Sequence, residues 1–408
     1  MPQPISFARG APSLDIVDVE GLRDAAARAF DRDPGGMTAY GTSVGYPPLR
    51  EWIAQRHQVA PERVLVTNGS MQADAFLFEA LVKPGDTVIV EHPTYDRTLL
   101  SLRGRGADVR AVELEPDGID VSAVERLLGG GGGDTAARPK LAHIIPNFQN
   151  PAGYTLSGAK RERLVEIARA YELTIFEDDP YVELRFEGSS LPTMLSLDGD
   201  GAGAGAGEGI GAGEGAGEAI GAGKGERVVY ASSFSKTVCP GIRVGYLVGP
   251  EELITRIAKI ATGTYISPSM VSQGIVNEFC RSGAIEHSIE TVKAALRERA
   301  QTLCQALATQ LPEARFVPPQ GGYFLWVALP PGTDVNALHA VAAQRGVQFV
   351  RGSDFVLQGA RSSLRLAYSG VTPDEIEEGV TRLADAYAEV ALLGDADALA
   401  GERATDAP

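Results

Sequence analysis

The sequence predicts an α/β protein with a large, mostly parallel sheet covered by helices on both faces, together with a smaller α/β domain. Apolar, β-branched runs alternate with amphipathic stretches of helical period from about residue 40 to residue 250. Such alternation is typical of βαβ units and a parallel sheet. Polar and glycine-rich segments follow several of these runs, at the strand ends where open α/β sheets bind ligands.

Composition excludes several classes of protein. The chain has 408 residues, 44% of them hydrophobic and 22% charged, which is ordinary for a globular protein. Its formal net charge of -16 argues against a nucleic-acid surface, which needs a basic stripe. No apolar run is long enough to span a membrane, and no secretory signal is visible. Three scattered cysteines indicate reduced thiols and a cytoplasmic protein, and no metal-ligand cluster is expected.

The domain organisation follows from these patterns. We predict an N-terminal arm over residues 1–35, which belongs to the small domain, and a large domain over 36–275. The small domain continues over 276–393, and a flexible tail follows over 394–408. A Gly-Ala-Glu segment at about 199–225 lacks the apolar side chains that would offset its ordering entropy, so it reads as a surface insertion without function.

The first part of the chain is predicted to contribute to a pocket and to an anion-binding site. The arm carries a helix over Val19–Phe30, and a loop with Tyr40 leads into a helix over Leu49–His57. A strand over Val64–Thr67 precedes a helix that ends near Val82. The backbone amides at the start of this helix would face an anion; they belong to Gly69, Ser70 and Met71. Without a phosphate implied elsewhere, this is an ordinary capped helix.

The next strands end in candidate ligand residues. Thr87–Glu91 is predicted to be a buried strand, and Tyr95 lies just past it, either stacked on a planar ligand or in the core. A strand over Val109–Val112, a helix over Val121–Leu128 and a glycine-rich surface loop at 129–133 follow. The strand over Leu141–Ile145 leads to the turn with Asn150, and a helix covers Ala159–Tyr171.

Three consecutive carboxylates, Glu177, Asp178 and Asp179, follow the strand over Leu173–Phe176. Burial of carboxylates at a strand end is costly unless a positive group meets one of them. A solvated acidic loop is the alternative interpretation. Tyr181 comes shortly afterwards.

Lys236 is the residue around which the chain is organised. It follows a strand over Val228–Ala231 and precedes an apolar run over Val244–Val248. A partly desolvated lysine near other cations favours its neutral amine, which attacks carbonyls. The hydroxyls of Ser233 and Ser235 and the guanidinium of Arg243 suit a phosphate beside that amine. A carbonyl together with a phosphate indicates pyridoxal phosphate.

The C-terminal part is predicted to contain the helices 251–261, 270–281, 285–311, 334–345 and 374–393 and the strands 321–327, 347–350 and 363–368. The long helix at 285–311 is expected to join the two domains. Arg365, in a Leu-Arg-Leu context, presents a planar fork that matches a carboxylate, although an isolated edge-strand arginine would be unremarkable.

Taken in order, these segments resemble the fold-type I pyridoxal-phosphate aminotransferases of class I/II, which implies a mostly parallel sheet of the seven-stranded type. The resemblance covers nearly all of residues 5–392 except the Gly-Ala insertion. The runs Asp178-Asp179-Pro180-Tyr181 and Ser233-Phe234-Ser235-Lys236 are similar to the subgroup that contains 2-aminoadipate and kynurenine aminotransferases and the catalytic half of MocR-type regulators.

The resemblance implies a role for each cofactor residue. Lys236 would form the Schiff base, and Asp178, which fits the spacing to Tyr181 better than Asp179, would hold the ring nitrogen. Tyr95 would stack on the ring, and Asn150 with Tyr181 would contact the phenolic oxygen. The phosphate would lie on Gly69, Ser70, Met71, Ser233, Ser235 and Arg243, and Tyr40 would reach the phosphate of the neighbouring subunit in a homodimer.

The resemblance also implies a substrate pocket. Arg365 would bind the substrate carboxylate, and the remaining pocket residues would be Asn150, Gly10, Tyr323, Phe324 and Arg9. Arg9 stands where the family usually has glycine, so it either meets an acidic substrate side chain or points to solvent. Of these two interpretations, we favour the one in which Arg9 points to solvent.

The implied activity is transfer of an amino group from an L-amino acid to a 2-oxo acid, expected to be 2-oxoglutarate, by a ping-pong mechanism. The donor is 2-aminoadipate, an aromatic or a branched-chain amino acid. A lyase or decarboxylase that uses the same cofactor is the alternative, because a fold does not fix a function. A DNA-binding regulator would need a basic helix pair ahead of Tyr40, and the sequence shows none there.

Overall fold

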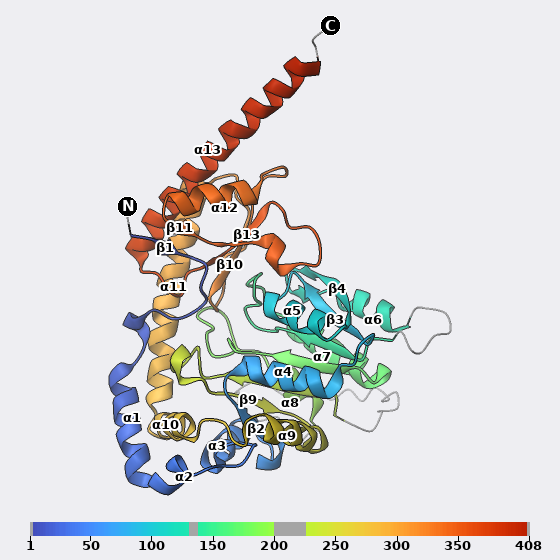
Figure 1. Cartoon of the computed structure of the whole chain (residues 1–408), viewed down its shortest axis with the longest axis vertical. Helices are drawn as coiled ribbons and strands as arrows, with labels where there is room; N and C mark the ends of the chain where they lie inside the picture. The colour runs from blue at the N-terminus through green and yellow to red at the C-terminus, as the bar shows by residue number, and fades with distance from the viewer. Residues whose placement is uncertain (1–2, 130–137, 200–225, 406–408) are drawn as a thin grey trace, which may run out of the picture.

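The computed structural model describes residues 3–129, 138–199 and 226–405. Most of the predicted low-complexity insertion and of the glycine run at 129–133 therefore lies outside the described residues. The elements form a large lower body around a twisted sheet and a smaller upper body, with one long helix running beside both (Figure 1).

The large sheet has eight strands among the described residues, and most of them are parallel, as predicted. The strands β8, β7, β6, β3 and β4 run parallel, whereas β9 is antiparallel to both of its neighbours and β5 forms an antiparallel edge. In spatial order the strands are β2 (Val64–Thr67), β9 (Gly245–Val248), β8 (Val228–Ser233), β7 (Thr174–Asp178), β6 (Leu141–Ile144), β3 (Thr87–His92), β4 (Asp108–Glu115) and β5 (Gly118–Ile119).

Helices cover both faces of this sheet because alternate residues of its strands point to opposite sides. Ile89 packs into one apolar cluster, whereas its neighbours Val88 and Val90 pack into another. The first face is covered by α3 (Pro47–His57), α6 (Val121–Gly129), α7 (Gly158–Tyr171), α8 (Met194–Asp198) and α10 (Met270–Arg281), and the second by α4 (Ser70–Leu81), α5 (Asp96–Gly104) and α9 (Glu251–Tyr265).

The smaller body is built around an antiparallel sheet of β10 (Phe324–Ala328), β13 (Ser363–Ala367) and β12 (Val350–Arg351). Near the N-terminus, β1 (Ile5–Ser6) pairs in parallel with β11 (Val347–Gln348), so the arm joins the C-terminal part of the chain. Two helices, α12 (Val335–Gln344) and α13 (Pro373–Thr405), complete this body. The helix predicted to end near Leu393 thus continues to Thr405, through most of the predicted tail.

Three further helices link the two bodies. The arm continues through α1 (Val19–Arg32), which packs on α10, and α2 (Pro34–Thr38). The longest connection is α11 (Ala284–Gln310), along the left of Figure 1. Its first apolar residues, Ile285 and Ile289, belong to the core of the large body, whereas Leu296 and Leu303 belong to the core of the smaller one. One helix therefore fixes the relative position of the two cores.

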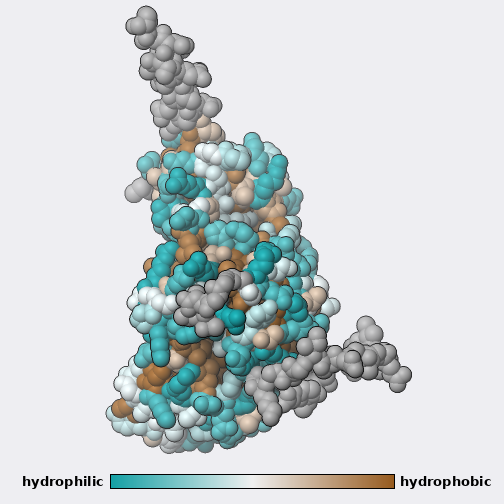
Figure 2. Space-filling model, turned by 90° about the vertical axis from the view of Figure 1, so that its right-hand side faces the viewer, coloured by the Kyte–Doolittle hydropathy of each residue, from teal (hydrophilic) through white to brown (hydrophobic). Residues whose placement is uncertain are grey.

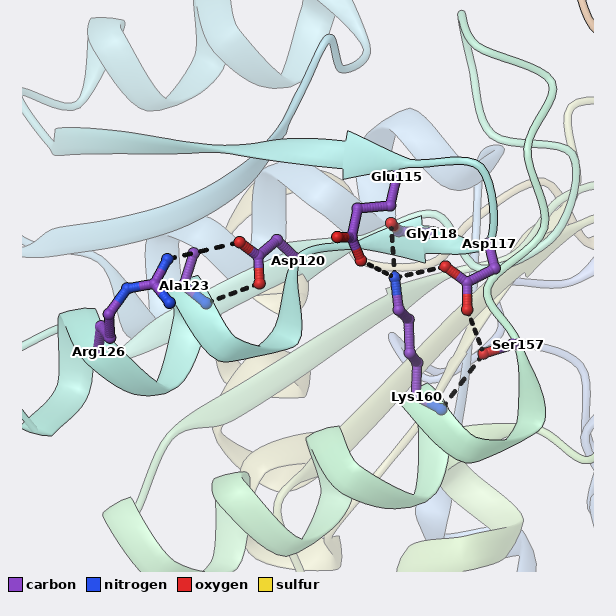
Figure 3. Close-up of polar contacts among 8 residues, drawn as sticks. All are labelled: Glu115, Asp117, Gly118, Asp120, Ala123, Arg126, Ser157 and Lys160. Carbon is purple, nitrogen blue, oxygen red and sulfur yellow. Dashed lines mark hydrogen bonds and ion pairs between the residues drawn. The ribbon is translucent and has the colours of Figure 1, made fainter.

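A cluster of charges holds the outer edge of the large sheet to α7 (Figure 3). Lys160 of α7 donates hydrogen bonds to a carboxylate oxygen of Glu115 at 2.5 Å and to the carbonyl oxygen of Gly118 at 3.2 Å, and its Nζ lies 2.6 Å from an oxygen of Asp117. Ser157 donates to Asp117 at 3.0 Å and caps the helix. This cluster pins the turn between β4 and β5.

The surface of the described residues is mostly polar on the face that Figure 2 shows. The apolar residues of this face gather in separate patches rather than in one continuous band. Among the described residues, no helix is both long enough and apolar enough to cross a membrane.

Candidate active site

A cleft of about 550 Å³ lies where the arm, the large sheet and the smaller body meet. It opens at the carboxyl ends of β7 and β8 and the start of α4, which is where an open α/β sheet places ligands. A larger cleft of about 770 Å³ lies near the opposite ends of these strands, beside Thr174 and Val229, and carries none of the predicted site residues. The smaller cleft is therefore the candidate site.

Most of the predicted site residues come together in this cleft. Fourteen of the seventeen line it: Arg9, Gly10, Ser70, Met71, Tyr95, Asn150, Asp178, Tyr181, Ser233, Ser235, Lys236, Arg243, Phe324 and Arg365. Gly69 lies directly behind Ser70 as the residue before α4, and Tyr323 lies behind Lys236, with its hydroxyl donating to the Lys236 carbonyl oxygen at 3.1 Å. Tyr40 does not line this chain's cleft and is 88% exposed.

Lys236 follows β8 and projects its amine into the cleft. Its Nζ donates a hydrogen bond to the carbonyl oxygen of Gly10 at 2.8 Å, so the arm closes over the lysine. Burial lowers the pKa of Lys236 to about 8, and the nearby guanidinium groups of Arg365, Arg243 and Arg9 contribute in the same direction. About a tenth of the amine is therefore neutral at pH 7, far more than for an ordinary lysine, and the neutral form is the one that acts as a nucleophile.

Asp178 is the last residue of β7 and presents a carboxylate to the cleft. Its Oδ2 lies 3.4 Å from Nε2 of His143, a fully buried residue on the neighbouring strand β6. Its Oδ1 is buried and finds no hydrogen-bond partner among the described residues. A buried carboxylate oxygen without a partner is costly, so this atom is prepared for a donor supplied by a ligand.

The two other carboxylates of the acidic run serve the interior instead. Glu177 accepts the backbone N–H groups of Met194 and Leu195 at 2.8 Å each, at the start of α8. Asp179 accepts a hydrogen bond from the side-chain amide of Asn147 at 2.8 Å. Of the three carboxylates, Asp178 alone lines the cleft, because neighbouring residues of a strand point to opposite sides.

The start of α4 and the residues after β8 form a cradle for an anion. Arg243 donates to the hydroxyl of Ser235 at 3.3 Å and to the carbonyl oxygen of Asn68 at 3.2 Å, beside the first turn of α4. Gly69 has a φ of 85°, and a Cβ atom there would lie 2.0 Å from the Arg243 guanidinium. Glycine is therefore required for the arginine to reach the helix N-terminus, where backbone amides and the macrodipole favour an anion.

Arg365 lies on the opposite wall, in β13. Its Nη1 donates to the side-chain oxygen of Asn150 at 2.9 Å and its Nη2 to the carbonyl oxygen of Ala8 at 2.5 Å. The guanidinium stacks on the rings of Phe324 and Phe355, at 4.3 and 4.8 Å from their centroids. These contacts hold a planar cation at the cleft, and its Nε is buried without a partner among the described residues.

Two tyrosines complete the walls. Burial raises the pKa of Tyr95 to about 12, with the charges of Asp96, Asp178 and Asp74 adding to the shift. Burial also raises the pKa of Tyr181 far above its usual value. Both phenols are therefore neutral at physiological pH, so each offers a flat ring and an O–H donor.

Arg9 is an exposed residue, as the solvent interpretation expects, and it also lines the mouth of the cleft, close enough for its charge to act on Lys236. Its guanidinium makes no hydrogen bond or ion pair with the described residues. It is therefore available to a ligand at the mouth of the cleft.

Among the residues that sequence reasoning missed at the site, three bear on its chemistry. His143 lies behind Asp178, and Phe355 stacks on Arg365; in an isolated sequence both look like ordinary core positions. Asp74, on α4, lines the cleft as well. The sequence could have indicated Asp74, because a residue four positions after Ser70 lies on the same face of the helix.

The chemistry of the residues in the cleft fits pyridoxal phosphate. The unpartnered Oδ1 of Asp178 suits a ring N–H, the neutral fraction of Lys236 suits an aldehyde, and the cradle at α4 suits a phosphate. Tyr95 supplies an aromatic wall beside them. Within the described residues there is no cluster of potential metal ligands.

Comparisons with known proteins agree with this chemistry. The sequence profile of the aminotransferase class I and II family matches residues 2–383. The chain is 32% identical to a 2-aminoadipate transaminase of Thermus thermophilus over 93% of this chain and 89% of that protein. It is 28% identical to aromatic-amino-acid aminotransferase 1 of Thermococcus litoralis over 94% of this chain and 88% of that protein.

A solved structure shows the same fold. The alpha-aminoadipate aminotransferase of Thermus thermophilus, in complex with N-(5'-phosphopyridoxyl)-L-leucine, superposes with a TM-score of 0.85 at 30% identity. The similarity covers 96% of this chain and 93% of that one.

Proposed function

Because the chain belongs to the class I and II aminotransferases and is a pyridoxal-phosphate enzyme, we propose that it moves the amino group of an L-amino acid to 2-oxoglutarate in two half-reactions. This proposal is supported by the observation that three groups with the required chemistry line the same cleft. The amine of Lys236, the unpartnered Oδ1 of Asp178 and the guanidinium of Arg365 all face it.

Bound pyridoxal phosphate supplies an aldehyde that bonds to amines and a cationic ring that withdraws electrons from the substrate. Asp178 would accept the ring N–H and keep that nitrogen protonated. The phosphate would be held by Arg243, Ser235, Ser233 and the amides of Gly69, Ser70 and Met71. Tyr95 would pack on the ring, and Asn150 and Tyr181 would contact its phenolic oxygen.

The remaining residues act on the substrate. Arg365 binds the α-carboxylate through its fork, with Asn150 beside it, and so orients the Cα–H bond toward Lys236. The neutral Nζ of Lys236 takes the α-proton and later returns it, as general base and then general acid. The arm at Gly10 and the ring of Phe324 exclude water, while Tyr323 supports the backbone of Lys236 from behind.

The donor we propose is an acidic amino acid, 2-aminoadipate, rather than an aromatic or branched-chain one. Arg9 supports this choice, because it lines the cleft with no ion-pair partner among the described residues. A side-chain carboxylate would supply that partner. The printed name of the Thermus relative, a 2-aminoadipate transaminase, is consistent with it.

We further propose a cytoplasmic homodimer with the domain division predicted above. In this arrangement Tyr40, which is 88% exposed in the single chain, reaches the cofactor phosphate of the neighbouring subunit.

The test is amino transfer by the enzyme purified with its cofactor. Given nitrogen-15 glutamate and a 2-oxo acid, it is expected to form one labelled amino acid for each 2-oxoglutarate released. Lys236→Ala should lower kcat by about a thousandfold or more. Lys140→Ala should not change it, because Lys140 is an exposed lysine just before β6 that does not line the cleft.

Two readouts refine this result. Release of ammonia or carbon dioxide without a labelled amino acid would instead identify a lyase or decarboxylase. Arg9→Met should lower the preference for glutamate over leucine, measured as the ratio of kcat/KM values, by about tenfold. An unchanged ratio would refute the acidic donor while leaving the transfer reaction established.

A further inference from the structure

Asp74 is a carboxylate in the cleft for which the proposed function has no use. It lies in α4 one turn after Ser70, is 5% exposed and lines the same cleft as Asp178. Its Oδ1 is buried and has no hydrogen-bond partner among the described residues, as is also true of Asp178 Oδ1. The neighbouring buried residues of the helix, Ala73 and Phe76, are apolar and offer it none.

A structural role does not account for this side chain. Glu177 accepts two backbone N–H groups, and Asp179 accepts the amide of Asn147 with one oxygen. The other oxygen of Asp179 also lacks a partner among the described residues, but Asp179 does not line the cleft, whereas Asp74 does. An unpaired buried carboxyl weakens a fold, and an apolar residue of the same size would strengthen it. A group that is costly to the unloaded protein and faces a ligand cleft indicates a compensating role in binding.

The charges around Asp74 show what kind of ligand group it would meet. Asp178, on β7, is near enough for its charge to raise the pKa of Asp74 further, after burial, and both carboxylates act on Tyr95, on the loop before α5. Two carboxyl groups and a neutral phenol therefore share one end of the cleft. Of the cations that line the cleft, Arg97 lowers the pKa of Tyr95 but does not act on Asp74, and Lys236 and Arg243 contribute to neither shift. This end is suited to a ligand cation.

We propose that Asp74 is a second carboxylate for the protonated ring nitrogen of the cofactor, placed beside Asp178 to strengthen cofactor binding. The inference rests on the proposed position of the ring nitrogen at Asp178. Asp178 accepts the N–H directly, and Asp74 acts as a positioning residue through its charge. The ring cation favours the ionised form of both carboxyl groups, and this attraction offsets the cost of their burial.

The proposal makes two predictions of opposite sign. Asp74→Leu should raise the dissociation constant of pyridoxal phosphate from the unloaded enzyme by about tenfold, since a nearby charge changes proton affinity by at least about that factor. The same substitution should raise the melting temperature of the unloaded protein, because it removes an unpaired buried carboxyl. Asp74→Asn, which keeps the shape without the charge, should weaken binding to a similar extent.

Binding is measured by quenching of intrinsic fluorescence, and melting by circular dichroism without cofactor. Inorganic phosphate, which has no ring, serves as the second probe, and its protection of the unloaded enzyme against melting should be the same in wild type and Asp74→Leu. Glu177→Gln is the matched control: it should lower the melting temperature, because Glu177 accepts two backbone N–H groups, and leave the dissociation constant of pyridoxal phosphate unchanged.

Each outcome decides a different point. An unchanged dissociation constant in Asp74→Leu would overturn the proposal, and so would a weaker binding that appears together with a lower melting temperature and lost phosphate protection. Asp178→Asn separates this inference from the function it rests on. If Asp178→Asn weakens binding and Asp74→Leu does not, the role of Asp74 alone fails; if neither does, the ring nitrogen is not at Asp178.

Discussion

Lys236 shows how a single residue obtains its chemistry from its surroundings. The sequence places it after an apolar strand and near an arginine, and the structure adds two more arginines and a carbonyl acceptor from the arm. Burial and three cations act in one direction, and the charge of Asp178 opposes them without cancelling the effect. The lysine is reactive because it is surrounded by groups that disfavour its charge.

The reactivity of Lys236 should follow its titration. Capture of pyridoxal phosphate by the unloaded enzyme, followed by stopped-flow absorbance, should accelerate with pH and level off above a midpoint of about 8. Arg365→Met should move this midpoint upward, because a neighbouring positive charge is lost. A profile that still rises near the ordinary lysine pKa would contradict the assignment.

The same pKa has a consequence for stability. The folded-state value lies below the ordinary one, so the unfolded chain binds the extra proton between the two values, and the free energy of unfolding rises with pH over that interval. Below about pH 8 the buried charge destabilises the fold. Lys236→Met should therefore raise the melting temperature at pH 7 more than at pH 10.

For single residues, the sequence indicated which side chains belong to the site better than it indicated where those side chains point. Lys236, Arg243 and Arg365 carry signals in their neighbours along the chain, and the structure brings all three to one cleft. Arg9 was given the simpler solvent reading because a loop arginine carries no signal of direction. Asp74 was overlooked because the apolar residues of its helix dominated the pattern.

At the scale of the elements, β9 packs so closely against the start of α4 that there is no room for a side chain at Gly245. A Cβ atom on Gly245 would lie 2.5 Å from the backbone nitrogen of Ser70 and 2.6 Å from the carbonyl carbon of Gly69. Both atoms belong to the backbone, so they cannot turn away as a side chain would. This contact sets the position of the helix N-terminus relative to Arg243.

Gly245→Ala should therefore disturb both the fold and the anion cradle. We expect a loss of about 1–3 kcal/mol in the free energy of unfolding, measured in urea, because a methyl group is forced into a packed contact. Weaker binding of pyridoxal phosphate should accompany it. Gly241→Ala is the control, since a Cβ there meets nothing within 4 Å; equal effects of the two substitutions would contradict this explanation.

The elements themselves were largely predictable. Strands such as β3 and β8 are continuous apolar runs because both of their faces are covered, and such runs are legible in a sequence. The helix α5 was not predicted: it has nine residues, and one of its leucines, Leu100, is 55% exposed. Short helices depend on tertiary packing that local pattern does not show.

At the scale of the whole molecule, the single chain leaves Tyr40 outside its own cleft. The proposed homodimer brings in the partner's copy of this residue, so each site would contain groups from two chains. The arm, the large sheet and the smaller body already contribute to one cleft, and the second chain would be a fourth contributor. Nothing in one sequence places groups across an interface.

Mixed dimers test this arrangement. Tyr40→Ala should bind the cofactor weakly, and Lys236→Ala should be inactive. When the two variants are unfolded together and refolded at equal amounts, about half of the dimers carry one chain of each kind, and each of these has one complete site. Transfer activity should return to about a quarter of the wild-type value. No recovery, with mixed dimers demonstrated by mass spectrometry, would place Tyr40 in its own subunit's site.

The helix α11, which belongs to both cores, restricts how this protein can change over generations. A single residue inserted between Ile289 and Leu296 would turn one core by about 100° relative to the other and shift it by about 1.5 Å. Arg365 and Phe324 would then no longer meet Lys236 and Asn150. A substitution in α11 changes only the packing around that residue. An insertion or deletion there changes the relative position of the two cores and therefore the geometry of the cleft. The length of this helix is therefore expected to vary less among descendants than its sequence.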